Sequence, residues 1–341
     1  MASLRIGFAG TAKNTGKTTT MSATMEEFLR HGWRLGLTSI GYDGEDLDNV
    51  TGLPKPRIFA PSGLIVATAL RCMDLSSAGL TVKVTTDVYT PLGQVAIAVV
   101  SRPGLVVLAG PSHSQGLLRA LEGMEAEGAQ VTFIDGAFNR ISPMNVAHGM
   151  VLCTGAARDT RIPVLAEEAE SVEYIMGLPV WGEGGLVKLK GGCLMGEEPG
   201  VTDVELGDRA GVLVEGVVSP VPLSWFLSKN HERFLGKWVV FQDSLKLMVG
   251  GKAAANTKVI REFRELGVGF ALQRSLRLLG VSVNPFYPER KGSDGTFEAK
   301  YVSASKLMSA FRSRLKAPVV NVVQDGAEAI YRSALQLVGN G

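Results

Sequence analysis

Short apolar runs alternate with stretches of helical periodicity along the first half of the chain. The runs have the length of strands, and several are continuously apolar, as strands covered on both faces are. They are Leu4–Ala9, Leu35–Ile40, Leu80–Thr86, Gln94–Val100, Leu105–Ala109, Val131–Ile134 and Met150–Cys153. After the first run, Met21, Met25, Phe28 and Leu29 share one face of a predicted helix. This alternation predicts an α/β fold with a mostly parallel sheet and helices on both faces.

The composition changes between about residues 182 and 210, where glycine and charged residues are frequent. We therefore predict a first domain at 1–185, a linker or exposed hairpin at 186–204, and a second, smaller α/β domain at 205–341. The strand-like runs of the second domain are Gly211–Val218, Trp238–Phe241, Leu245–Val249, Val281–Val283 and Val319–Val323. Its helical patterns lie around Thr257–Leu266, Ser303–Leu315 and Ala327–Val338.

Composition and charge exclude several classes of protein. Of 341 residues, 45% are hydrophobic and 20% charged, which is typical of a globular protein. The net charge of +2 gives no basic field for nucleic acid. The most apolar stretch, 95–109, is interrupted at 101–104, so it falls short of the ~20 residues of a membrane helix. Cys72, Cys153 and Cys193 are widely separated, and the N-terminal LRIGFAG is strand-like. We therefore expect reduced thiols, no signal peptide and a cytoplasmic location.

The most informative motif is GTAKNTGKTT, which lies between the first strand-like run and the first helix. A strand, a glycine-containing loop with Gly-Lys-Thr, and a helix together indicate a P-loop that binds a nucleotide. Backbone N–H groups of such a loop surround a phosphate, and the helix adds its positive N-terminal end. The predicted nucleotide-binding residues are Gly10, Thr11, Ala12, Lys13, Asn14, Thr15, Gly16, Lys17, Thr18 and Thr19.

The roles within this motif follow from residue chemistry. Lys17 is expected to neutralise the β- and γ-phosphates and to act in catalysis, and the Thr18 hydroxyl to ligate Mg²⁺. Thr19 is placed to hydrogen-bond the α-phosphate, and a Cβ at Gly16 would crowd the incoming phosphate. No guanine-specific NKxD motif stands at a suitable place, so ATP is the expected nucleotide.

Carboxylates are also needed to organise Mg²⁺ and the attacking group. Asp135 closes the run VTFID, and the acidic stretch GYDGEDLDN follows the second run. We predict catalytic and metal-binding roles for Asp135 and Asp43, with Glu45 as the next choice. The alternatives are an Asp135 that caps the following helix and a solvated acidic loop around Asp43.

Other segments are weaker candidates. Lys55 and Arg57, in the stiff sequence PKPR, either hold a second anion or lie in a surface loop. Ser112–Gln115 joins a strand to a helix and is a candidate second-substrate loop. Arg140 either reaches a phosphate or pairs with a neighbouring acid. Thr154–Ala156 follows a late strand, where P-loop proteins often contact the base.

The form G-T-x-x-x-x-G-K-T resembles the loop of dethiobiotin synthetase and, more distantly, the P-loop class that includes the MinD ATPases. The Asp135-Gly136-Ala137 strand end is also similar to that of the dethiobiotin synthetase relatives. The lysine that marks the MinD loop would fall at Ala12, and this difference argues against activation by a lysine supplied across a dimer. A homodimer remains one possibility for the assembly.

Three segments together, GTAKNTGKTTT, SIGYDGEDLDNVTGLPKPRI and FIDGAFNR, resemble a further P-loop family. With VNPF and the closing PVVNV, the resemblance spans most of the chain. The family is encoded beside the adenosylcobalamin-dependent lysine 5,6-aminomutase and has a proposed role as a subunit of its reactivase. The resemblance implies a chaperone-like ATPase whose protein partners are the aminomutase and a second reactivase ATPase subunit.

Three functions follow as alternatives. The first is a Mg-ATP-driven switch that serves a partner enzyme. The second is an ATP-dependent ligase or small-molecule kinase of the dethiobiotin synthetase type. The third is a scaffold that binds nucleotide without turnover. Neither a nucleic acid nor a membrane is expected as a partner.

Overall fold

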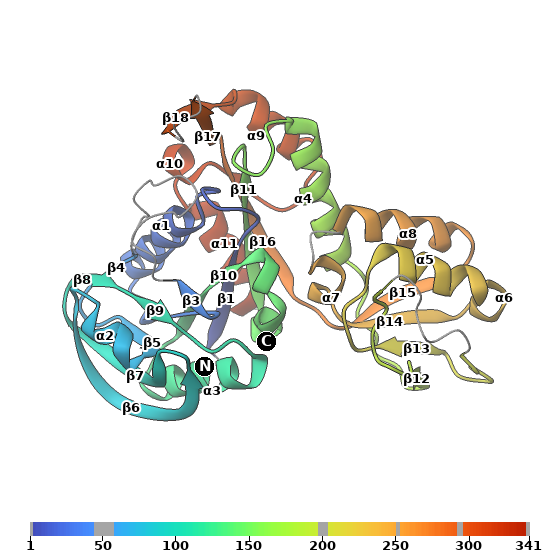
Figure 1. The fold of residues 1–341 in the computed structure, drawn as a ribbon, viewed down its shortest axis with the longest axis horizontal. Helices are drawn as coiled ribbons and strands as arrows, with labels where there is room; N and C mark the ends of the chain where they lie inside the picture. Colours follow the sequence, from blue (N-terminus) through green and yellow to red (C-terminus); the bar gives the residue numbers. More distant parts are fainter. Residues whose placement is uncertain (1–2, 44–57, 197–203, 250–252, 292–295, 339–341) are drawn as a thin grey trace. The chain divides into compact units, whose positions relative to one another are not determined.

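The computed structural model describes residues 3–43, 58–196, 204–249, 253–291 and 296–338. The chain divides into two compact units, one made of residues 1–166 and 278–341 and the other of residues 167–277. In Figure 1 the first unit therefore combines the blue, cyan and green part of the ribbon with the red C-terminal part. The second unit is an insertion between two segments of the first.

The first unit is built on a nine-stranded sheet in the order β19-β16-β11-β1-β10-β2-β5-β7-β6. Its strands are β1 (Leu4–Gly10), β2 (Leu35–Ser39), β5 (Ile65–Ala69), β6 (Gly79–Thr90), β7 (Gly93–Arg102), β10 (Val131–Ala137), β11 (Gly149–Gly155), β16 (Arg277–Asn284) and β19 (Val319–Val320). The pairs β1–β10, β1–β11, β10–β2, β2–β5 and β16–β19 are parallel. The pairs β5–β7 and β6–β7 are antiparallel. The mostly parallel sheet predicted from the apolar runs is confirmed.

Helices cover both faces of this sheet. Leu35 and Leu37 of β2 belong to a core with Met21, Met25 and Phe28 of α1 (Lys17–Arg30). The intervening Gly36 faces the other way, because a Cβ there would lie 3.2 Å from Met124 of α3 (Ser114–Ala126). Since neighbouring residues of a strand point to opposite faces, α1 and α3 lie on opposite sides. α11 (Glu328–Val338) packs on the side of α1.

The remaining elements of the first unit are short. They are the helices α2 (Leu70–Asp74), α9 (Ala304–Arg312) and α10 (Val322–Asp325), the 3₁₀ turns η1 (Phe138–Arg140) and η2 (Ser142–Val146), and three antiparallel pairs. The pairs are β3 (Tyr42–Asp43) with β9 (Leu108–Ala109), β4 (Ile58–Ala60) with β8 (Gly104–Val106), and β17 (Phe286–Lys291) with β18 (Thr296–Tyr301).

The second unit contains a four-stranded, all-parallel sheet in the order β12-β13-β14-β15. Its strands are β12 (Leu186–Lys188), β13 (Gly211–Val214), β14 (Trp238–Asp243) and β15 (Gly269–Arg274). Its helices are α5 (Pro220–Lys229), α6 (His231–Phe234), α7 (Leu245–Met248) and α8 (Ala253–Glu265), and α4 (Ile162–Met176) crosses from the first unit into the second. α5 and α8 pack together on one side of the sheet (Figure 1).

The division of the chain differs from the boundaries expected from composition. The expected second domain at 205–341 includes β16 and β19, yet both strands lie in the nine-stranded sheet of the first unit. The expected linker at 186–204 contains β12, which pairs with β13. A linear change in composition cannot show that a later strand returns to an earlier sheet, because that pairing depends on tertiary contacts.

One predicted strand is a helix in the structure. Leu245–Val249 is a short and mostly apolar run, but residues 245–248 form α7. The Asp243 carboxylate accepts a hydrogen bond from the Lys246 N–H at 3.3 Å, which favours a helical turn directly after β14. Likewise, the predicted strand Val319–Val323 is divided between β19 and α10.

Candidate functional site

The ends of four neighbouring strands meet at one edge of the large sheet. Gly10 of β1 lies opposite Ala137 of β10 and Cys153 of β11, and Asp135 lies opposite Ser39 of β2. Because these strands are parallel, their carboxyl ends share one edge, which is where open α/β sheets bind ligands. This edge therefore brings together the predicted loop after β1 and the predicted acid on β10.

The loop between β1 and α1 spans residues 11–16 and contains two residues of left-handed backbone. Gly16 has φ +81° and Asn14 has φ +63°, both in the left-handed region. The Thr15 hydroxyl donates to the Ala12 carbonyl at 2.9 Å, and the Thr11 N–H donates to the Cys153 carbonyl at 3.0 Å. No acidic side chain occupies the first turn of α1, so its positive end is not neutralised there. This arrangement suits an anion.

Lys17 and Asp135 form a largely buried ion pair at this edge. The Lys17 Nζ lies 2.6 Å from Asp135 Oδ1, and the two side chains are 16% and 3% exposed. The structure thus places the lysine of the motif beside the predicted acidic strand end. A cation and a carboxylate held together out of water are the charges that a Mg-nucleotide site requires.

A buried thiol lies behind the pair. Cys153 is fully buried, and burial raises the pKa of its thiol to about 12. Thr20 and Lys17 act in the opposite direction, and the Asp135 carboxylate adds to the rise. Cys72 is also buried, and its thiol pKa is raised by burial, whereas Cys193 is exposed.

This contrast predicts how the cysteines react. At pH 8 the native protein should show one rapidly reacting thiol, at Cys193, and the unfolded protein all three. The thiolate is the reacting form, and burial both raises the thiol pKa and blocks access at the other two positions. Titration with a colorimetric disulfide reagent, with and without denaturant, measures the counts. Rapid reaction of the Cys153 thiol with the reagent in the native protein would contradict the described packing.

Asn284, at the end of β16, is a contact of the loop that sequence analysis did not assign. Its Nδ2 donates to the Asn14 carbonyl at 2.9 Å. Two residues earlier on the strand, the Ser282 hydroxyl accepts from the Thr20 hydroxyl at 2.7 Å. The sequence VNPF entered only through the family resemblance, and nothing in the linear pattern relates Asn284 to a loop 270 residues away.

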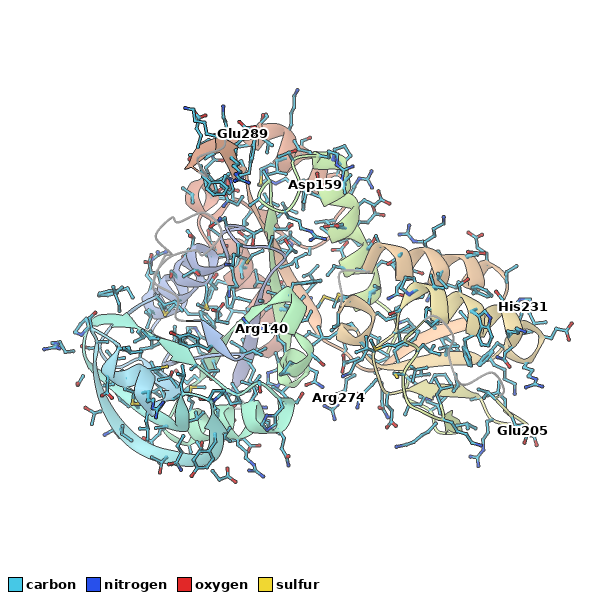
Figure 2. All side chains as sticks on the ribbon, in the orientation of Figure 1. Arg140, Asp159, Glu205, His231, Arg274 and Glu289 are labelled. Atoms are coloured by element: carbon cyan, nitrogen blue, oxygen red, sulfur yellow. The ribbon has the colours of Figure 1, made fainter. Side chains whose placement is uncertain are left out.

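The structure gives contacts for some of the other predicted residues, and the rest lie outside the described residues. Thr11 donates through its hydroxyl to the Thr154 hydroxyl at 3.0 Å, so the carboxyl end of β11 adjoins the β1–α1 loop. The guanidinium of Arg140, which is labelled in Figure 2, lies beside Gly41 in the turn after β2. The Gly41 N–H donates to the Pro111 carbonyl at 3.3 Å, which places the start of the Ser112–Gln115 segment beside the same turn. Glu45, Lys55 and Arg57 lie outside the described residues, as does the side chain of Asp43.

The donor set suits Mg²⁺ rather than a metal that requires a complete protein cage. Within the described ranges, no three His, Cys, Asp or Glu side chains gather as a metal site. Magnesium is usually held by one or two carboxylates together with substrate phosphates, and it prefers oxygen ligands. The Thr18 hydroxyl, directly after Lys17, and the Asp135 carboxylate are oxygen donors of this kind.

Comparisons with known proteins give no family. No protein-family model matches the chain, and no curated protein shows significant similarity to it. Among the residues that the structure describes, no helix combines the length and apolar character needed to span a membrane.

Proposed function

We propose that this protein binds Mg-ATP through the β1–α1 loop and acts as a nucleotide-driven switch on a P-loop NTPase-type fold. The observation that carries the proposal is the Lys17–Asp135 pair at the carboxyl edge of a parallel sheet, directly after a loop with two left-handed residues. In this proposal Lys17 contacts the β- and γ-phosphates. Thr18 and Asp135 hold Mg²⁺, which neutralises charge on the phosphates. Asp43 is proposed as a further acid.

The residues of this chain are proposed to bind phosphate and to stabilise charge during hydrolysis. The loop N–H groups and the end of α1 bind the phosphates, and Lys17 stabilises charge that develops during phosphoanhydride hydrolysis. When a γ-phosphate arrives, Lys17 exchanges part of its contact with Asp135 for phosphate oxygens. Such an exchange gives the site two states, as a switch requires. The resemblance to the reactivase family supports an aminomutase and a second ATPase subunit as the partners of this switch.

A glycine pair at the two ends of α1 tests nucleotide binding. Gly16 has φ +81° beside the predicted phosphate, and Gly32 has φ +79° with open space around it. Gly16→Ala should reduce Mg-ATP affinity by at least tenfold, because the left-handed backbone beside the phosphate is strained and the new Cβ lies 3.5 Å from the Asn284 side chain that contacts the loop. Gly32→Ala carries the same backbone penalty of about 1–2 kcal/mol but should keep the affinity unchanged.

Isothermal titration with Mg-ATP measures the affinity. Thermal unfolding measures stability, which saturating ATP at 100 times Kd should raise by about 2.7 kcal/mol in the unaltered protein. Equal loss of affinity in both variants would indicate a general effect of destabilisation. Absence of ATP binding to the unaltered protein would refute the proposal. Binding without any phosphate release would favour the ligase or scaffold function over the switch.

A further inference from the structure

Asn284 connects three segments that are far apart in the sequence. Its Nδ2 donates to the Asn14 carbonyl in the β1–α1 loop, and its Oδ1 accepts from the Phe286 N–H at 3.1 Å, at the start of β17. Its own carbonyl accepts from the Ala156 N–H at 2.9 Å, after β11. A Cβ at Gly155 would collide with this carbonyl, so the approach is close. One residue thus contacts the loop, the β11 exit and the β17–β18 hairpin.

The contact with the loop is made at its strained position. Among the residues that the structure describes, Asn14 is the non-glycine residue with a positive φ. Asparagine tolerates this conformation better than most residues, yet it remains unfavourable without support. The hydrogen bond from Asn284 fixes the Asn14 carbonyl, and thereby the direction of the N–H groups that follow it.

The contact with the hairpin is made at its base. β17 and β18 pair from Phe286 opposite Tyr301 to Lys291 opposite Thr296, and the Val302 N–H donates to the Pro285 carbonyl at 3.0 Å. None of the described side chains of the hairpin is buried, and Tyr301 is 68% exposed. Lys300 of β18 also contacts Glu289 of β17, labelled in Figure 2, across the two strands, and Glu298 on its own strand. The hairpin is therefore held together internally and joined to the sheet at residues that adjoin Asn284.

A purely local role explains only part of this arrangement. The hydrogen bond from the Phe286 N–H to Asn284 Oδ1 closes an Asx turn, a common local conformation in which an asparagine side chain accepts from the backbone two residues later. The bond to the Asn14 carbonyl has no local purpose, because it spans 270 residues of sequence. The planar side-chain amide of Asn284 makes both hydrogen bonds. If the Asn14 carbonyl moves, the amide rotates with it, and the hydrogen bond from the Phe286 N–H to Oδ1 is altered.

We propose that Asn284 is a positioning residue that couples phosphate occupancy of the β1–α1 loop to the stability of the β17–β18 hairpin. A bound phosphate fixes the loop N–H groups, which holds the Asn14 carbonyl against Asn284. The amide then holds the Phe286 N–H, and the base of the hairpin opens less often. The nucleotide state thereby changes how often the base of the hairpin opens. This inference rests on the proposed nucleotide binding and goes beyond it by naming the element that responds.

Hydrogen exchange of the full chain tests the coupling. In the unaltered protein, saturating Mg-ATP should slow exchange at Phe286 and Val302 by about 3- to 10-fold, the effect of one neutral hydrogen bond. Asn284→Asp keeps an acceptor for the Phe286 N–H but replaces the donor to Asn14 with a negative charge. We expect this variant to bind Mg-ATP about tenfold more weakly and, at saturation, to show no slowing at the hairpin. Asn321→Ala, which removes the side-chain cap of α10 in the same unit, should retain both responses.

The outcomes separate the two proposals. ATP binding without hairpin protection in the unaltered protein overturns the coupling and leaves nucleotide binding intact. Full protection in Asn284→Asp at saturation overturns the role of Asn284. Failure of the unaltered protein to bind ATP refutes the proposed function and the coupling with it. If the aspartate variant does not fold, Asn284→Ala replaces it in the exchange experiment. Tryptic cleavage of the unaltered protein at the exposed Arg290 and Lys291 then tests the coupling without any substitution. Mg-ATP should slow that cleavage, and an unchanged cleavage rate overturns the coupling.

Discussion

Lys17→Ala is expected to lower the rate of phosphate release from Mg-ATP by about 10²-fold or more, because it removes a cation from the developing charge. The structure adds a second consequence. Asp135 is 3% exposed and lies 2.6 Å from Lys17 Nζ, so the substitution leaves a buried carboxylate without its cation. Breaking a buried pair on one side typically costs about 3–5 kcal/mol, and the partial exposure of Lys17 places the expected cost below that range.

A double variant separates catalysis from folding. Lys17→Ala/Asp135→Asn removes both charges, so it should recover most of the lost stability while phosphate release stays low. Release assays with purified protein, beside urea unfolding, distinguish the two effects. Lys83→Ala, an exposed lysine on the edge strand β6, serves as the unaffected control. If the double variant regained turnover together with stability, Lys17 would be a structural residue and its catalytic role would be wrong.

Phe28→Ala should cause a large loss of stability. Phe28 of α1 is fully buried and packs edge-to-face on Phe133 of β10 at 5.5 Å and on Tyr331 of α11 at 4.7 Å, measured between ring centroids. Truncating a buried phenylalanine costs about 3–5 kcal/mol through lost burial and the resulting cavity. Urea unfolding followed by circular dichroism measures the change.

Phe59→Ala is the matched control for this substitution. Phe59 of β4 is 55% exposed, so its truncation should change the free energy of unfolding by no more than about 0.5 kcal/mol. Phe28 joins α1 to both the sheet and the C-terminal helix, so its effect also tests whether the N- and C-terminal segments form one unit. An effect of Phe28→Ala near that of Phe59→Ala would contradict the shared core.

The strands and helices of the first half could be predicted from the sequence because the hydrophobic pattern of each element is contained within its own residues. Apolar runs such as Val131–Ile134 are buried strands, and the spacing of Met21, Met25 and Phe28 gives one buried helix face. The strand predicted at Leu245–Val249 was wrong because a short apolar run fits a strand, whereas the Asp243 carboxylate supports a helical turn there. A local hydrogen bond outweighed a short apolar pattern.

Some residues of the candidate site could be predicted from the sequence, and others only from the structure. The motif from Gly10 to Thr19 and the strand end at Asp135 were identifiable from residue type and position. Their proximity follows from parallel pairing, which places the ends of β1 and β10 at one edge. Asn284 was not identifiable as a contact of the loop, because its hydrogen bond to Asn14 depends on β16 joining the sheet beside β11.

The sequence by itself determined most local elements of the first half and the loop between β1 and α1, which arise from propensity and periodicity over a few residues, and the alternation of these elements predicted the mostly parallel sheet. The tertiary structure alone decided that residues 278–341 complete the first unit, that Lys17 meets Asp135, and that Asn284 supports the loop. The physical reason is that strand order is set by long-range burial. Several orders satisfy the same local pattern, and only the packed chain selects one of them.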